Sequence, residues 1–399
     1  IIVGRTISVE ALAAVGATGS ISFLIVGFVQ GVTSGFAVIT AQRFGAGSEN
    51  GVRRSVATSI ILGIAVTIVM TAISVLAARP LLEIMKTPSD IIDDSYNYII
   101  VIFEGIAAAV FFNLFSSILR SLGDSKTPLV FLIIASIINI ILDFVFILTF
   151  KMGVAGAAIA TVTGQICAAI LAITFNLTKN PDVHISFKGF KPQIIFVKNI
   201  LSVGIPSIIM SSVGSAMTFG MNKILITFSS TAVAVFGVYF KLNSFVFMPV
   251  FGLNNGMVPI VSYNYGAQNK KRLTKTIKLA IMYAVCIMFI GIMLFQFIPD
   301  VLLKLFDASD HMLEIGIPAL RVISLSFAFA GICIVISSSL QALGHGFLSM
   351  MISITRQLII LLPSAYILAK IGGIHAVWWS FNIAEIGSLT LSLLFFKHM

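Results

Sequence analysis

The sequence predicts an all-α integral membrane protein. Three observations support this fold class: an apolar composition, a series of long apolar runs and an internal repeat. Of the 399 residues, 58% are hydrophobic and only 10% are charged, and the mean hydropathy is +1.07. A soluble domain carries about 25% charged residues. This chain therefore has too few charges to cover a surface that faces water, and lipid must cover most of it.

Eleven apolar runs of about 20 residues or more follow one another, and about 20 residues cross the hydrocarbon core of a bilayer as a helix. In chain order, the predicted spans are residues 10–40, 54–78, 91–116, 128–150, 154–177, 197–227, 231–262, 274–298, 313–338, 347–369 and 374–396. Short segments of alternating apolar and polar residues are missing, which argues against a barrel. The runs therefore predict a helical bundle.

The net charge of +10 is distributed unevenly over the loops. Alternate loops are basic, with Arg43, Arg53, Arg54, Arg120, Lys126, Lys179, Lys188, Lys191, Lys198, Lys270, Lys271, Arg272, Lys275 and Lys278. The opposite loops are acidic, with Glu83, Asp90, Asp93, Asp94, Asp300, Asp307, Asp310 and Glu314. This asymmetry places the basic loops and the C-terminus in the cytoplasm, and it argues against a nucleic-acid partner. The three cysteines lie far apart in apolar runs, which disfavours disulfides and metal sites.

The sequence repeats itself at an offset of 221 residues. "EALAAVG" (10–16) matches "TAVAVFG" (231–237), "RFGAG" (43–47) matches "NYGAQ" (264–268), and "SSILRSLGD" (116–124) matches "SSSLQALGH" (337–345). Toward the end the offset becomes 220, where "MGVAGAAIA" (152–160) meets "GGIHAVWWS" (372–380). The matches predict two halves with the same order of helices.

The repeat also predicts a twelve-helix plan with eleven helices complete here, since the counterpart of the run at 197–227 lies mostly before residue 1. We therefore expect an N-lobe at 1–180, with the tail of helix 1 and helices 2–6, and a C-lobe at 181–399, with helices 7–12. Two such lobes, related by a pseudo-two-fold axis along the membrane normal, suit alternating access to a central cavity. An old duplication in a structural membrane protein is the alternative.

Four ionisable residues inside the predicted spans stand out: Glu104, Asp143, Lys241 and Glu385. A charge at mid-bilayer costs about 2.5–3.5 kcal/mol on insertion scales, so such residues are functional candidates. Asn139 and Asp143 are four residues apart and share a helix face. Thr161 lies nine residues after the turn near Met152, and Asp143 nine before it, which puts the two at similar depth. Asn139, Asp143 and Thr161 together offer hard oxygen ligands for Na⁺, or a carboxylate that can bind a proton. The alternative is an aspartate that is simply hydrogen-bonded between helices.

Lys241 and Glu385 each lie about ten residues inside their helices, counted from the same side. We expect them to form an ion pair that either stabilises packing or switches during transport. Glu104 has no obvious partner.

The sequence has no GxxxxGK[ST] loop, HExxH or GxSxG motif, so we expect neither an enzyme nor a cofactor. Without a nucleotide site, uphill transport would depend on an ion gradient.

In several stretches, which include Asn139, Asp143 and Thr161, the sequence resembles the multidrug and toxic compound extrusion (MATE) family of bacterial-type efflux transporters. The resembling stretches are "ALAAVGATGSISFLIVGFVQGVTSGFAVITAQRFGAG", "LRSLGDSKTP", "NIILDFVF", "GVAGAAIAT" and "FVFMPVFGLNNGMVPIVSYNYGA", and they span nearly the whole chain in order. The family's N-lobe cation site uses an Asp on helix 1, Asn and Asp on helix 5 and Thr on helix 6. The last three match Asn139, Asp143 and Thr161, while the helix 1 Asp would fall before residue 1.

The resemblance implies export of bulky, often cationic or amphipathic compounds in exchange for H⁺ or Na⁺, by a multi-pass protein of the bacterial plasma membrane that works as a monomer with small-molecule substrates. Some members carry a second, C-lobe cation site with acids on helices 7 and 10, and this chain lacks those acids. Two other readings stay open. A flippase for a lipid-linked precursor would use the same scaffold but a strongly cationic cavity, and an intramembrane enzyme would need a nucleophile–base or metal pattern.

Overall fold

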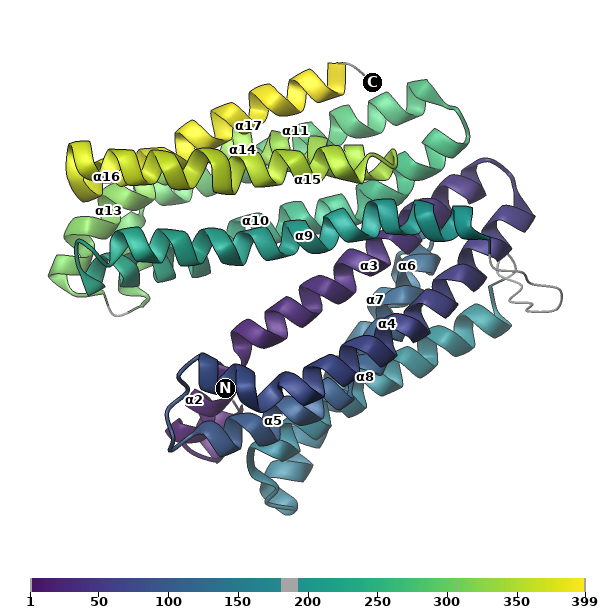
Figure 1. Ribbon diagram of the computed structural model, residues 1–399, viewed down its shortest axis with the longest axis horizontal. Coiled ribbons are helices and arrows are strands. Elements are labelled where there is room, and N and C mark those ends of the chain that lie inside the picture. Colours follow the sequence, from purple (N-terminus) through teal and green to yellow (C-terminus); the bar gives the residue numbers. More distant parts are fainter. Residues whose placement is uncertain (1, 181–192, 307, 398–399) are drawn as a thin grey trace. The chain divides into compact units, whose positions relative to one another are not determined.

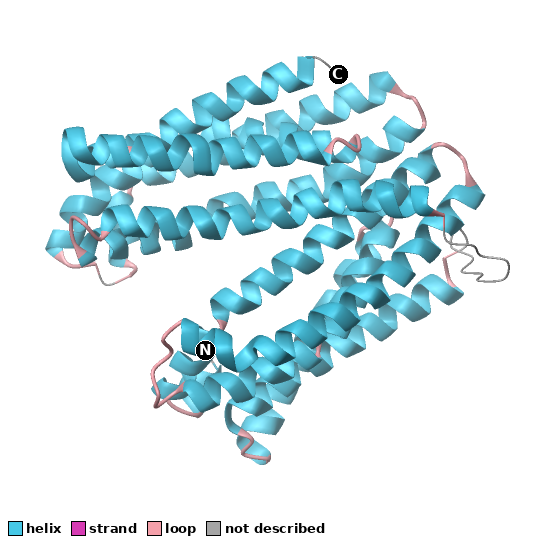
Figure 2. Cartoon of the chain, in the orientation of Figure 1, coloured by secondary structure: helices cyan, strands magenta, loops and turns pink. Residues whose placement is uncertain are grey.

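The computed structural model is almost entirely helical and describes residues 2–180, 193–306 and 308–397 (Figures 1 and 2). Within those ranges no residue lies in a strand. Three residues of the predicted loops, Lys188, Lys191 and Asp307, are outside the described residues. The all-α prediction is confirmed.

The helices form two compact units, Ile1–Gly204 and Ile205–Met399. Unit 1 contains α1 (Ile2–Thr6), α2 (Val9–Ala17), α3 (Gly19–Gly45), α4 (Glu49–Ile84), α5 (Ile92–Glu104), α6 (Ile106–Ser121), α7 (Lys126–Phe144), the π-helical turn η1 (Val145–Thr149), α8 (Gly153–Thr178) and the start of α9 (Ile194–Leu225). Unit 2 contains the rest of α9, α10 (Ser230–Gly266), α11 (Lys270–Phe297), α12 (Pro299–Lys304), α13 (Asp310–Ser324), α14 (Phe327–Ala342), α15 (Gly346–Ile354), the π-helical segment η2 (Thr355–Leu361), α16 (Leu362–Val377) and α17 (Trp379–Lys397).

The division between the units falls inside α9, whereas the sequence analysis placed it at residues 180 and 181. The start of α9 packs on α3 at Gly35, where a side chain would collide with the backbone oxygen of Ile200. Gly204 likewise approaches the backbone of Val32. Because these contacts are backbone against backbone, the first turns of α9 are held by unit 1.

The eleven predicted spans correspond to helices in the described part of the chain. Nine helical segments are long and apolar enough to cross a membrane, and two bent pairs, α5 with α6 and α13 with α14, bring the number to eleven if each pair is one span. The pairs bend by 43° and 49°. Large apolar side chains on these helices point outward, such as Leu76 at 80% exposed and Phe245 at 77%. Outward apolar side chains are what a hydrocarbon surrounding requires.

The internal repeat is visible in how the helices begin. Ser8 caps α2 by accepting from the N–H of Ala11, and its counterpart 221 residues later, Ser229, caps α10 in the same way. Ser48 caps α4, and its counterpart Asn269 caps α11. Each side-chain oxygen satisfies a backbone N–H that the first helical turn leaves unpaired. Both halves therefore start equivalent helices at equivalent residues.

The repeat is equally clear where helices end or break. Three equivalent pairs of residues have a positive φ: Gly47 and Gln268 at 67° and 54°, Gly123 and Gly344 at 96° and 91°, Gly153 and Gly373 at 59° and 64°. The first two pairs are 221 residues apart and the last is 220 apart, as the sequence comparison predicted. The two bent pairs also break at Gly105 and Ser326, which are 221 apart. Glycine is common here because it adopts a left-handed backbone without strain.

Equivalent helices pack in equivalent ways inside each unit (Figure 1). In unit 1, α3 contacts α4 and α6, and α8 contacts α6 and α7. In unit 2, α10 contacts α11 and α14, and α17 contacts α14, η2 and α16. Unit 1 buries a core that includes Leu82 and Phe103, and the core of unit 2 includes Phe236, Phe327 and Trp378. The two halves are thus pseudo-symmetric in packing, and α7–α8 corresponds to α15–η2–α16–α17.

Candidate functional site

The candidate site lies on the hairpin formed by α7 and α8. The chain turns between them through Lys151 and Gly153, which both have a positive φ. Higher up the hairpin, Gly164 of α8 allows a close approach, since a Cβ there would lie 2.9 Å from the backbone oxygen of Ala135 and 3.3 Å from the Cβ of Asn139. The missing side chain at Gly164 therefore lets Asn139 lie directly against α8.

Asn139 and Thr161 are in contact across this hairpin. The Nδ2 of Asn139 donates to the Oγ1 of Thr161 at 3.3 Å, and that hydroxyl donates to the backbone oxygen of Ala157 at 3.0 Å. The Thr161 hydroxyl is thus held in place from both helices. The structure brings together two of the three predicted site residues, and it does so by a direct side-chain hydrogen bond.

Asp143 lies on the same face of α7 as Asn139, four residues or about 6 Å further along the helix. Its side chain is partly buried, and its Oδ1 atom is buried without a hydrogen-bond partner in the described chain. The Tyr98 ring of α5 lies within electrostatic range of this carboxylate. A buried polar atom without a partner costs about 1–3 kcal/mol, and more when charged, which a proton or a small cation at Oδ1 would relieve.

The break between α5 and α6 packs beside the same part of α8. Gly105 lies against Val162, the neighbour of Thr161, so closely that a Cβ at residue 105 would overlap the Val162 side chain. The preceding residue, Glu104, is exposed and makes no ion pair or hydrogen bond with the described chain. The structure thus places Glu104 on the surface and gives it no link to the Asn139–Thr161 contact.

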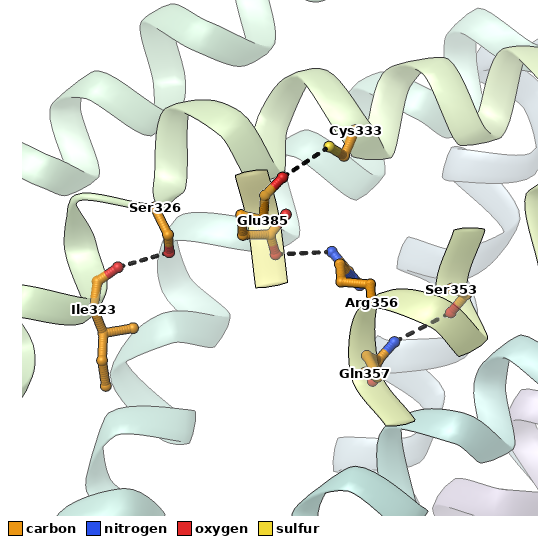
Figure 3. A network of polar contacts seen from close by, with 7 residues as sticks. All are labelled: Ile323, Ser326, Cys333, Ser353, Arg356, Gln357 and Glu385. Atoms are coloured by element: carbon orange, nitrogen blue, oxygen red, sulfur yellow. Dashed lines mark hydrogen bonds and ion pairs between the residues drawn. The ribbon is translucent and has the colours of Figure 1, made fainter. Parts of the chain in front are cut away.

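The expected ion pair between Lys241 and Glu385 is not formed. Glu385 pairs with Arg356 of η2, whose Nη1 lies 3.1 Å from the Oε1 of Glu385 (Figure 3). The Arg356 side chain is 22% exposed and that of Glu385 is 13% exposed. Lys241 is exposed and has its Nζ atom 5.7 Å from the centre of the Phe306 ring, within the range of a cation–π contact.

The length of α10 explains the error over Lys241. The helix has 37 residues. At 1.5 Å per residue it is about 55 Å long, well beyond the ~30 Å of a hydrocarbon core. A residue in the fourth turn of such a long helix is therefore still near the membrane surface, and a lysine there can extend its amine out of the hydrocarbon. Phe306, which receives this amine, follows the short helix α12 in the connection to α13.

Arg356 is the residue that the sequence analysis overlooked. It stands in "SITRQLII", inside the apolar run 347–369. A guanidinium in such a run is a signal of the same kind as the four ionisable residues that were selected. The repeat supplied a second signal, because it makes the helices of Arg356 and Glu385 the counterparts of the adjacent helices of Asp143 and Thr161.

The hairpin site can hold a hard monovalent cation or a proton. It offers a carboxylate, an amide and a hydroxyl, and oxygen atoms are the ligands that hard cations prefer. Among the described residues, no group of three or more His, Cys, Asp and Glu side chains could hold a metal ion. A single carboxylate with neutral oxygen partners suits an ion that is taken up and released.

The chain matches the family model MatE over residues 1–145 and 206–367. It is 27% identical over 328 residues to the multidrug export protein MepA of Staphylococcus aureus, covering 82% of this chain and 72% of that protein. It is 27% identical over 401 residues to the probable multidrug resistance protein YoeA of Bacillus subtilis, covering 98% and 86%. A crystal structure of MATE in the bent conformation superposes with a TM-score of 0.95 at 25% identity, covering all of this chain and 89% of that one.

Proposed function

The chain belongs to the MatE family of multidrug efflux transporters, and on that premise we propose that it is a secondary active antiporter. It exports bulky, often cationic or amphipathic compounds in exchange for H⁺ or Na⁺. The observation that carries the ion coupling is the buried, unpartnered Oδ1 of Asp143, one helical turn from the Asn139–Thr161 contact.

The proposed cycle alternates the charge of Asp143. In one state the coupling ion neutralises the carboxylate, with the oxygens of Asn139 and Thr161 as neutral ligands. In the other state the ion has left, and the ionised carboxylate is partly buried and unpaired. An ionised carboxylate away from water is costly, so the empty site favours either uptake of a new ion or a rearrangement that exposes it. In alternating access, binding or release of the ion determines the side of the membrane to which the cavity opens, and hence where the cargo is released.

The membrane setting follows from the same reasoning. The chain is a multi-pass membrane protein with bacterial relatives. We place it in the bacterial plasma membrane, with the basic loops and the C-terminus on the cytoplasmic side, because lysine and arginine accumulate in cytoplasmic loops. It works as a monomer on small-molecule cargo, with the coupling ion in place of a cofactor.

The flippase alternative gains no support from the comparisons, because the relatives described above are multidrug export or resistance proteins. Its chemistry also asks for several cations facing a pyrophosphate. In unit 2, Lys241 extends to Phe306 near a helix end and Arg356 is already neutralised by Glu385.

The experiment is expression of the chain in a bacterium that lacks its main efflux pumps, with a panel of cationic and neutral drugs. An antiporter raises the tolerated concentration of several drugs, and inverted vesicles respond to added drug with proton or Na⁺ flux. Ser136→Ala is the matched control for changes at Asp143, since Ser136 is an exposed residue of the same helix whose hydroxyl, among the described residues, bonds only to the backbone oxygen of Leu132. Accumulation of a lipid-linked precursor on deletion, without any drug phenotype, would support the flippase instead.

A further inference from the structure

Both units carry a partly buried acid on the same equivalent pair of helices. In unit 1 the acid is Asp143 of α7, beside α8. In unit 2 it is Glu385 of α17, beside η2. Each carboxylate has one buried oxygen without a hydrogen-bond partner in the described chain, Oδ1 of Asp143 and Oε2 of Glu385. The two acids differ in what faces them.

In unit 2, an aromatic ring stands at the position of the Thr161 hydroxyl. The counterpart of Thr161 at the 220-residue offset is Phe381, which is buried. Its ring centre lies 5.7 Å from that of Tyr239 and 6.2 Å from that of Phe236. The acid of unit 2 follows one helical turn later, at Glu385. A small cation therefore finds no hydroxyl at the place where unit 1 offers Thr161.

Glu385 already has a cation beside it. The Arg356 guanidinium donates to its Oε1 at 3.1 Å, while the titratable groups that face it from other helices are the Cys333 thiol of α14 and the Tyr239 hydroxyl of α10. The Cys333 Sγ lies 4.0 Å from the backbone oxygen of Glu385 (Figure 3). Arg356 is the one group among these that carries a positive charge, because a guanidinium stays protonated in proteins.

Oxygen atoms for a small cation are also close. Ser388 and Ser392 follow Glu385 by three and seven residues, hence on the same face of α17. Both residues are fully buried, their hydroxyls lie near the Cys333 thiol, and neither makes a hydrogen bond in the described chain. Glu385, Ser388 and Ser392 thus give a carboxylate and two hydroxyls on a single helix face.

From this contrast we infer that Glu385 is a second monovalent-cation site, which the chain fills permanently with its own Arg356 guanidinium. A buried acid needs a cation or a proton. Asp143 obtains one from solution, whereas Glu385 obtains one from the chain and cannot release it. Only one of the two acids then exchanges ions during transport. The comparison with Asp143 rests on the proposed function, but the claim about Glu385 can be tested without it.

The test measures ion binding to purified protein in lipid nanodiscs, in an Asp143→Asn background so that Asp143 contributes nothing. Radioactive Na⁺ gives the number of bound ions per chain, and the infrared band of protonated carboxylic acids reports proton uptake between pH 8 and pH 5. Three changes are added to that background: Arg356→Gln, Arg356→Lys, and Arg356→Gln together with Glu385→Gln.

Arg356→Gln should create one additional Na⁺ or proton site per chain, and adding Glu385→Gln should remove it. Arg356→Lys keeps the charge and should create none. Failure of folded Arg356→Gln protein to gain a site would overturn the inference. If that variant does not fold, the neutral pair Arg356→Gln, Glu385→Gln in the otherwise wild-type chain decides the matter. The inference requires unchanged Na⁺ and proton binding there, and loss of a site would contradict it. Asp143 can fail as a coupling site without altering any of these outcomes.

Discussion

The side-chain amide of Asn139 donates a hydrogen bond to the hydroxyl of Thr161 across the α7–α8 hairpin, at 3.3 Å. This bond fixes two neutral oxygen-bearing groups one helical turn from the buried, unpartnered oxygen of Asp143. On the proposed function, Asp143 is the charged member of a small polar site that the coupling ion completes, which accounts for a carboxylate inside an apolar helix.

Removing the Thr161 hydroxyl should weaken binding of the coupling ion. Thr161→Val keeps the size of the side chain but loses the oxygen, and a lost hydrogen-bonding group of this kind costs about 1–2 kcal/mol, or roughly 5- to 30-fold in affinity. The apparent affinity for Na⁺ or H⁺ in vesicle transport measures the change. Thr161→Ser should restore most of it. Thr163→Val is the control, because within the described part of the chain the Thr163 hydroxyl bonds only to the backbone oxygen of Ile159 in its own helix, at 2.7 Å.

Gly164 should tolerate no side chain without loss of function. In Gly164→Ala the new Cβ would meet the Ala135 oxygen at 2.9 Å and the Asn139 Cβ at 3.3 Å, so α7 and α8 must separate and the Asn139–Thr161 bond must lengthen. We expect reduced coupling-ion affinity and a lower unfolding temperature. Gly16→Ala should do neither, since a Cβ on that exposed helical residue meets no atom within 4 Å. Equal behaviour of the two variants would rule out the close approach at Gly164.

Double-mutant cycles should separate the true partner of Glu385 from the expected one. Alanine changes at Arg356 and Glu385 should be strongly non-additive, because breaking a buried ion pair on one side costs about 3–5 kcal/mol while removing both partners spares that cost. Changes at Lys241 and Glu385 should be additive within about 0.5 kcal/mol. Thermal unfolding in detergent provides the measurement. Non-additivity between Lys241 and Glu385 would restore the pairing that the sequence suggested.

Asp124 should make stability depend on pH at the start of α7. Partial burial favours its protonated form, but hydrogen bonds from Thr127 and Lys126, with backbone N–H to carboxylate distances of 3.0 and 3.1 Å, hold the pKa of Asp124 below its ordinary value. A lowered pKa in the folded state means stability that is present above the unfolded pKa, about 3.9, and lost as pH falls through the folded value.

Asp124→Ala should therefore lower the free energy of unfolding by about 1 kcal/mol near pH 7, the typical value of a helix cap, and by less below pH 4. Thermal unfolding between pH 3 and pH 7 measures this. Asp90→Ala is the control, because Asp90, an exposed residue, holds the equivalent position two residues before α5 but makes no side-chain hydrogen bond to that helix in the described chain. A difference between wild type and Asp124→Ala that stays constant over this range would contradict the role of the ionised carboxylate.

Much of the fold could be predicted because the repeated residues are ones that determine local structure. Residues that start helices, such as Ser8 and Ser229, or that turn left-handed, such as Gly123 and Gly344, are determined by neighbours in the chain. Apolar runs likewise determine which helices meet lipid. These features can be recognised in the sequence without knowing how the helices pack against one another.

Depth within the hairpin could be predicted only in part. Counting nine residues on each side of Met152 puts Thr161 at the same depth as Asp143. In the structure Thr161 is instead at the depth of Asn139, to which it is hydrogen-bonded. The π-helical turn η1, residues Val145–Thr149, contributes to this difference, because a π-helix gains less height per residue than an α-helix. Sequence patterns give no clear sign of a π-helical turn, so the count overestimated the height of Asp143 above the turn.

The partner of Glu385 could not be derived by counting depth at all. Lys241 and Glu385 were compared as if both helices had the thickness of a bilayer, whereas α10 has 37 residues and α17 has 19. The length of a helix depends on how far it extends beyond its apolar run. The apolar run alone does not indicate that extension. The correct partner, Arg356, was accessible from helix adjacency in the repeat rather than from depth.

The most direct test asks whether Asp143 binds the coupling ion. It measures transport by purified protein in proteoliposomes, with a pH gradient and a Na⁺ gradient imposed separately. The Asp143→Asn variant should insert and bind a cationic drug like the wild type, yet export none of it under either gradient, while Ser136→Ala exports at the wild-type rate. Gradient-driven export by Asp143→Asn at the wild-type rate would show that the coupling ion binds elsewhere.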